Sequence, residues 1–174
     1  MPRKSRPPLI DAIAPEPEGP VEIRFTVPGR PVPKARPRLG AGGRVFTPAT
    51  TAAAERAVAA AAWAAWPRAA AFSARPVEVE AVFRYAVPSS WPKHRRLLAI
   101  SGGLAMTSGA DVDNLAKTVL DGLNGGPIID DCAVVAVSAR KEWAAQDETD
   151  VIVRILPVSA SLAQDRDPET EGTR

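Results

Sequence analysis

The chain has 174 residues, 45% of them hydrophobic and 24% charged, with a formal net charge of +2 at pH 7. This length suits one domain of about 100 to 200 residues. The single cysteine, Cys132, excludes an intramolecular disulfide framework, and no apolar run reaches the ~18 residues that a membrane span needs. Since no secretion signal follows Met1, we expect a globular cytoplasmic protein without a membrane partner.

The N-terminal third combines a disordered arm, a strand and a long loop. Residues 1–20 mix Pro, Lys, Arg and Glu without a period of 2 or 3.6, which predicts disorder. Residues 21–27 alternate apolar and polar side chains up to Pro28, which predicts a half-buried strand. Prolines and glycines in Arg30–Phe46 predict an extended loop, and a loop this long is usually functional or disordered.

The middle of the chain is predicted to form a helix, a strand and an irregular segment. A helix capped by Thr47 or Thr50 should run to about Trp66, where Pro67 stops it. Residues 76–87 alternate as a second strand. The structure of residues 88–110 stays open, with a short helix at 93–100 as one interpretation.

The last third is predicted to contain a helix and two strands. A helix should run from Asp113 to Leu123 and end in Asn124-Gly125-Gly126, residues that favour a left-handed backbone. Residues 133–137 and 151–155 should form a terminal hairpin, followed by a disordered tail at 158–174. The pattern predicts a single-domain α/β fold over residues 21–157, with a small mixed β-sheet of about four strands and two main helices packed on it.

Two stretches of the chain are strongly basic. Residues 23–54 contain six cations and no acid, and three cations flank His94. Such stretches can contact the phosphates of a polyanion, although solvated surface loops explain them equally well. We expect no catalysis by His94, because no partner for it is identifiable. The candidate DNA contacts in these stretches are Lys34, Arg36, Arg38, Lys93, Arg95 and Arg96.

Four aspartates form two carboxylate pairs, Asp111 with Asp113 and Asp130 with Asp131, separated by one helix that could bring both to one side of the sheet. Magnesium prefers oxygen ligands and shares its sphere with water and substrate phosphate. Lys117, one turn past Asp113, could neutralise charge on a reacting phosphate.

Each of these features also has an ordinary structural interpretation. Asp113 could cap a helix, and Lys117 and Asp121 could form a surface pair at i, i+4. Asp130 and Asp131 could belong to a turn.

The combined spacing of the motifs is more specific than any one of them. It runs through Pro28–Arg38, Phe46–Pro48, Asp111-Val-Asp-Asn-Leu-Ala-Lys117, Asp121-Gly-Leu-Asn-Gly125 and Asp130-Asp131 to Lys141. This pattern resembles the RusA family of Holliday junction resolvases. The resemblance implies a homodimeric α/β nuclease that binds four-way DNA junctions and makes paired nicks with magnesium, with manganese as an expected substitute and no nucleotide cofactor.

The resemblance also implies roles for individual residues. Asp111, Asp113 and Asp131 would be metal ligands and catalytic residues, Lys117 the essential lysine and Asp130 a secondary acid. Lys141 joins the candidate DNA contacts.

The chain departs from the family where Cys132-Ala133 replaces polar residues such as Ser-Gln, and where Thr107–Ala110 lacks the common Lys, Arg or Pro. A protein that binds branched DNA without cutting it, and a less selective nuclease acting on flaps or forks, therefore remain alternatives.

Overall fold

The computed structural model describes residues 21–36, 38–39, 45–46, 48–66, 75–124 and 131–157. The predicted N-terminal arm and C-terminal tail lie outside these residues. In chain order the described elements are β1 (Val21–Pro28), β2 (Arg38–Leu39), β3 (Val45–Phe46), α1 (Ala49–Ala65), β4 (Val77–Ala86), α2 (Lys93–Ile100), α3 (Val112–Leu123), the short 3₁₀ turn η1 (Asp131–Ala133), β5 (Val134–Ala144) and β6 (Glu148–Ile155).

Four strands form one mixed sheet in the order β1-β6-β4-β5. Strand β6 is antiparallel to both β1 and β4, whereas β5 runs parallel to β4 and lies at the edge. The prediction of a terminal hairpin is therefore wrong, because β4 lies between β5 and β6. Strand β4 has apolar residues buried along most of its length, including Val79, Ala81 and Phe83. Its central position pairs both of its edges with neighbouring strands.

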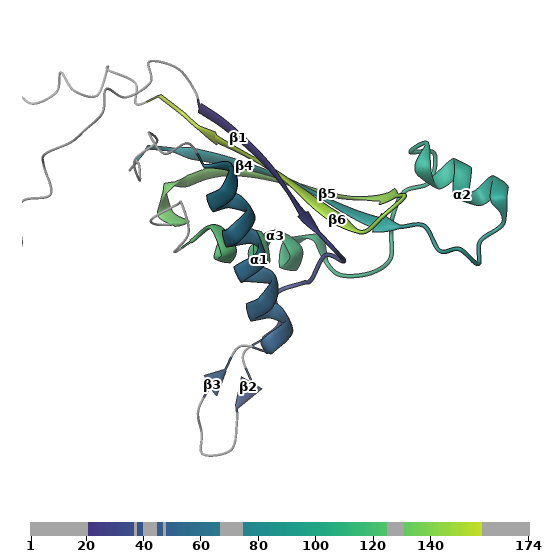
Figure 1. Ribbon diagram of the computed structural model, residues 1–174, viewed down its shortest axis with the longest axis horizontal. Helices are drawn as coiled ribbons and strands as arrows, with labels where there is room; N and C mark the ends of the chain where they lie inside the picture. Colours follow the sequence, from purple (N-terminus) through teal and green to yellow (C-terminus); the bar gives the residue numbers. More distant parts are fainter. Residues whose placement is uncertain are drawn as a thin grey trace, which may run out of the picture.

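Helices α1 and α3 cover one face of the sheet, while α2 projects beyond its end (Figure 1). The core lies between these two helices and the sheet, where Phe83, Leu115, Leu123, Val151 and Val153 are almost fully buried. The apolar face predicted for α3 is confirmed, and the α/β fold with a four-stranded sheet is confirmed with it. None of the helices that the structure describes is long and apolar enough to span a membrane.

The helix ends differ in detail from the prediction. Helix α1 begins after Pro48 rather than at a threonine cap, and its C-cap is Trp66. Helix α3 ends at Asn124 with φ −71° and ψ 124°, so Asn124 is extended and not left-handed. The chain leaves α3 directly in an extended direction, while the N–H of Asn124 still donates to the Leu120 carbonyl at 2.8 Å.

Two other segments also refine the prediction. The segment expected to be a plain loop contains a two-residue antiparallel ladder, in which β2 pairs with β3. The helix that was one interpretation of residues 93–100 is present as α2, which spans those residues.

The sheet face opposite the helices carries a network of ion pairs. Arg154 pairs with Glu22 and Glu80, and Arg84 pairs with Glu142, Glu148 and Asp150. The other two arginines of this face are paired as well, Arg24 with Glu22 and Arg140 with Glu80. All four arginines of this face have carboxylate partners, so this face offers a polyanion little unneutralised positive charge.

Gly122 marks a very close approach of α1 and α3. A Cβ atom at this position would lie 2.7 Å from Val58 Cβ and 2.8 Å from the Glu55 carbonyl oxygen. These atoms belong to α1, and the Glu55 carbonyl cannot move away unless the whole helix shifts. Gly122→Ala is therefore expected to lower the free energy of unfolding by about 1 to 3 kcal/mol. Urea denaturation measures this change.

Gly103→Ala is the matched control for this prediction. The added Cβ would meet mainly the end of the Leu98 side chain, which is 49% exposed and can turn away. We expect a change of less than about 0.5 kcal/mol. Equal losses of stability in the two variants would contradict the close helix contact as the cause.

Candidate active site

The start of α3 presents two carboxylates. Asp111 is the N-cap residue, but its side chain makes no capping hydrogen bond, and Asp113 follows in the first turn. Both side chains are exposed, and neither has an ion-pair or hydrogen-bond partner among the residues that the structure describes. Asp113 is therefore not the helix cap that the ordinary interpretation made it, and within the described part of the chain both carboxylates are free to bind a cation.

Lys117 lies one turn further along the exposed side of α3. The alternative pairing of Lys117 with Asp121 is absent, because the Asp121 carboxylate lies 2.5 Å from the ammonium of Lys34. Lys117 itself is exposed and has no ion-pair partner within the described part of the chain. An ammonium in this state can approach a phosphate without first leaving a carboxylate.

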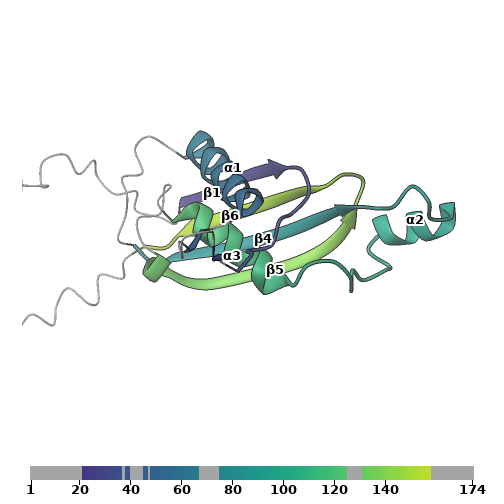
Figure 2. The same ribbon diagram turned by 90° about the horizontal axis from the view of Figure 1, so that it is seen from below.

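Asp113 and Lys117 both line an open groove of about 650 Å³ between α3 and the edge strand β5. We call it the α3–β5 groove. Its polar residues, all on α3, are Asp113, Lys117 and Asp121, and its apolar residues are Val112, Ala116, Leu120, Val134, Val137 and Ala139. Figure 2 shows α3 running beside β5. The charged residues of the groove all lie on α3, and the residues that β5 contributes are apolar.

Asp131 lies at a different place from Asp111. Its backbone belongs to η1, directly before Val134, the first residue of β5. The chain enters α3 near Lys141, whose ammonium donates to the Ala110 carbonyl. Val134 and Lys141 are seven residues apart on β5, a span of about 23 Å at about 3.3 Å per residue. One chain therefore brings Asp111, Asp113 and Lys117 together but holds the backbone of Asp131 near the far end of the groove.

The structure describes only part of the predicted set of metal ligands. No group of three potential metal ligands gathers among the described residues; Asp130 lies outside them, and the side chain of Asp131 is not described. Magnesium often takes only one or two carboxylates, together with waters and substrate phosphate oxygens. The unpaired carboxylates of Asp111 and Asp113 fit that requirement.

Two of the lysines predicted to contact DNA already have partners within the protein. Lys141 donates from Nζ to the carbonyl oxygens of Ser108 at 3.1 Å and Ala110 at 2.9 Å. Lys34 lies 2.5 Å from a carboxylate oxygen of Glu55 and 2.5 Å from one of Asp121. Charge along the sequence pointed to Lys34 and the family resemblance to Lys141, but neither revealed these acceptors.

The cations of the α2 arm (residues 91–100), by contrast, are exposed. Lys93, Arg95 and Arg96 lie on a helix with no acidic residue. The Arg95 guanidinium lies 3.9 Å from the centroid of the Trp91 ring, and that ring packs edge-on against Trp143 at 5.0 Å. Sequence reasoning missed Trp91, which fixes Arg95 by cation–π contact, although an indole four residues before an arginine was a readable signal. Arg36 is also exposed, and the side chain of Arg38 lies outside the described side chains.

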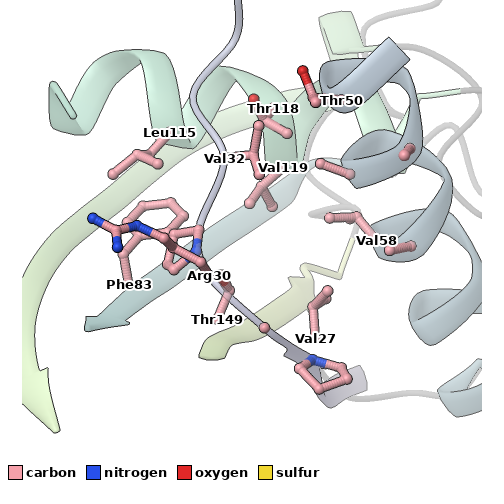
Figure 3. A pocket seen from close by; sticks show the side chains of 16 residues that line it. Val27, Arg30, Val32, Thr50, Val58, Phe83, Leu115, Thr118, Val119 and Thr149 are labelled. Carbon is pink, nitrogen blue, oxygen red and sulfur yellow. The ribbon is translucent and has the colours of Figure 1, made fainter. Parts of the chain in front are cut away.

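A second cavity, of about 330 Å³, lies between α1, α3 and the end of β1 (Figure 3). Its walls are mainly apolar, with Val58 on α1, Leu115 and Val119 on α3, and Phe83 on β4. Small residues of α1, among them Ala53 and Ala57, leave this space open. It contains no carboxylate and therefore does not compete with the α3–β5 groove as a metal site.

One comparison with known proteins gives a match. Residues 28–155, which make up more than half of the chain, match the family model described as Endodeoxyribonuclease RusA. The matched range includes the start of α3, the groove, Lys34 and Lys141. A search of curated proteins gives no match.

Proposed function

The chain belongs to the RusA family of endodeoxyribonucleases, and on this premise we propose that it is a magnesium-dependent nuclease that resolves four-way DNA junctions by paired nicks. We propose DNA recombination and repair in the cytoplasm as its setting. The observation that carries the proposal is the row at the start of α3 of two carboxylates, Asp111 and Asp113, followed by the ammonium of Lys117, none of which has a partner among the described residues.

The proposed chemistry divides between carboxylates and ammonium. Asp111 and Asp113 would hold the ion, with Asp131 as a further ligand and Asp130 as a secondary acid. Bound magnesium supplies polarisation of the phosphoryl group and a lower pKa of the attacking water, and manganese is expected to substitute for it. Lys117, one turn along the helix, would donate to a phosphate oxygen on which negative charge develops. The open groove admits the DNA backbone to these groups.

The distribution of unpaired cations favours DNA on the helix side and along the α2 arm. Lys93, Arg96 and Arg36 are exposed, and the Arg95 guanidinium lies over the Trp91 ring. We propose these residues, together with Arg38, as contacts to DNA phosphates. The arginines of the opposite sheet face are already neutralised by carboxylates, which makes that face a poor competitor for DNA.

Two features support a homodimer. First, β5 is an edge strand whose Val135 and Val137 are 60% and 47% exposed, and such an edge is usually covered or blocked in native proteins. Second, the separation between the backbone of Asp131 and the start of α3 leaves the proposed ligand set incomplete within one chain. A twofold axis perpendicular to the groove at its middle would place Asp131 of one chain near Asp113 of its partner, and twofold symmetry also matches the paired strands of a junction.

The test is cleavage of three labelled substrates, a four-way junction, a fork with a flap and a linear duplex, each with magnesium or with EDTA. Paired, magnesium-dependent nicks on the junction alone are the expected result. Cutting of all branched substrates at similar rates would replace the proposal by a less selective nuclease. Binding of the junction without cutting in either magnesium or manganese would replace it by a non-catalytic DNA-binding protein.

A further inference from the structure

Two lysines from distant parts of the chain bond to α3 and to the segment that leads into it. We propose that Lys141 and Lys34 are positioning residues that hold the carboxylate-bearing start of α3, and that neither contacts DNA. The inference rests on the proposed function only in so far as α3 carries the active site. The fastening itself is visible in the contacts of the two ammonium groups.

Lys141 fixes the segment that leads into α3. Its side chain rises from β5 on the helix-covered face, beside Phe83 in register, and it is half-buried. Two of its three N–H donors bond to the carbonyls of Ser108 and Ala110. The Ala110 carbonyl belongs to the peptide group whose nitrogen is that of Asp111, so this bond holds the backbone adjoining the first carboxylate.

The tethered segment forms no helix or strand, and Met106, which is buried in the core, is its other anchor besides Lys141. Residues 103–111, between the turn after α2 and the start of α3, form neither helix nor strand, and Gly109 adopts a left-handed φ of 85°. A segment without a hydrogen-bonded ladder depends on side chains for its position. Lys141 supplies two such bonds from the rigid sheet.

Lys34 fixes α3 from another direction. Its backbone N–H donates to the Asn114 carbonyl at 2.8 Å, in the first turn of α3. Its Nζ lies between Glu55 of α1 and Asp121 of α3, 2.5 Å from an oxygen of each. One side chain thus joins the segment after β1 to both helices.

The surroundings of Lys34 raise the pKa of its ammonium group. Burial alone would lower the pKa of its ammonium, but the hydrogen bonds and charges of Asp121 and Glu55 outweigh burial and raise that pKa above the usual value. The group therefore stays protonated throughout the pH range of a nuclease assay. If Lys34 turned toward DNA, two half-buried carboxylates would lose their shared partner, which opposes such a movement.

The test compares Lys141→Met and Lys34→Met with Lys93→Met, in which an exposed lysine of α2 loses the same charge. Hydrogen–deuterium exchange of the peptides that cover residues 109–118 and 119–124 reports the order of α3 and of the segment before it without DNA. Fluorescence anisotropy against salt concentration reports phosphate contacts, since loss of one contact lowers the slope of log K against log salt by about one. The rate of single-turnover cleavage reports how well the active-site residues of α3 are aligned with the DNA.

We expect at least about tenfold faster exchange of residues 109–118 in Lys141→Met and of residues 119–124 in Lys34→Met, with unchanged salt slopes, because Lys34→Met keeps the backbone bond to Asn114 and loses the pair with Asp121. We also expect single-turnover cleavage to fall about 10- to 100-fold, because displacement of a reacting group by about 1 Å costs about that much. Lys93→Met should show wild-type exchange and a slope lower by about one. Lys141→Arg, which keeps the donors, should restore slow exchange.

Unchanged exchange in both methionine variants, or a slope lower by about one in either of them, would overturn the proposal. If Lys34→Met does not fold, Glu55→Gln removes one of its two charged partners and is judged by the same two readouts. The exchange result does not need an active enzyme. Wild-type protein that fails to cut any DNA would therefore refute the proposed function and leave the positioning of α3 to be decided by exchange alone.

Discussion

Asp113→Asn is expected to lower the single-turnover rate of junction cleavage by about 10³-fold or more, with binding of the junction retained. Asparagine has the shape of aspartate but no negative charge, so it weakens the hold on magnesium at the point where the ion acts on phosphate. Stabilisation of the transition state by such an ion amounts to several kcal/mol, and each 1.4 kcal/mol corresponds to about tenfold in rate. Asp113 is exposed and unpaired, so the fold should not change.

The control for this prediction is Glu78→Gln, which removes one negative charge from β4, away from the groove. It should cleave at the wild-type rate within about twofold, because a surface charge at this distance is screened by salt. Asp113→Asn protein that still cleaves at a tenth of the wild-type rate would remove this residue from the metal site. Loss of junction binding in Asp113→Asn would indicate a role in the fold or in DNA contact.

A mixed dimer of Asp113→Asn and Asp131→Asn chains is expected to recover cleavage that neither variant has alone. If each site combines Asp113 of one chain with Asp131 of its partner, one site of the mixed dimer carries both substitutions and the other carries none. The intact site should cut one strand of the junction, with about half of the wild-type number of nicks. Co-expression with two different affinity tags isolates the mixed dimer for this assay.

The opposite result is equally informative. If the two aspartates act within one chain, every site in the mixed dimer carries one substitution and the mixture stays inactive. Inactivity would mean that Asp131 serves the same chain as Asp113. It would contradict the shared site but would leave the assignment of Asp113 unaffected.

Local patterns predicted most of the fold. Alternation identified β1 and β4, and the spacing of Leu115, Val119 and Leu123 identified the buried face of α3. The hairpin prediction failed because consecutive strands usually pair with each other, whereas here the apolar strand β4 lies between them. Strand order depends on competition for the centre of the sheet, and no local pattern records that competition.

The candidate site, like the fold, could be predicted from the sequence only in part. Asp111, Asp113 and Lys117 lie within two turns of one helix, so their spacing in the sequence is also their spacing in the molecule. The partners of Lys34 and Lys141 are distant carboxylates and backbone carbonyls. A carbonyl has no signature in the sequence, so a tethered lysine and a lysine free for DNA look alike until the fold is known.

Paramagnetic broadening by manganese tests most directly whether the metal ion binds at the start of α3. Amide resonances of ¹⁵N-labelled wild-type protein are followed as Mn²⁺ is added, beside those of Asp113→Asn. We predict that broadening in the wild type begins at residues 111–117 and that Asp113→Asn abolishes it at the same Mn²⁺ concentration. Broadening that begins elsewhere, or that is equal in the two proteins, would contradict a metal site formed by Asp111 and Asp113.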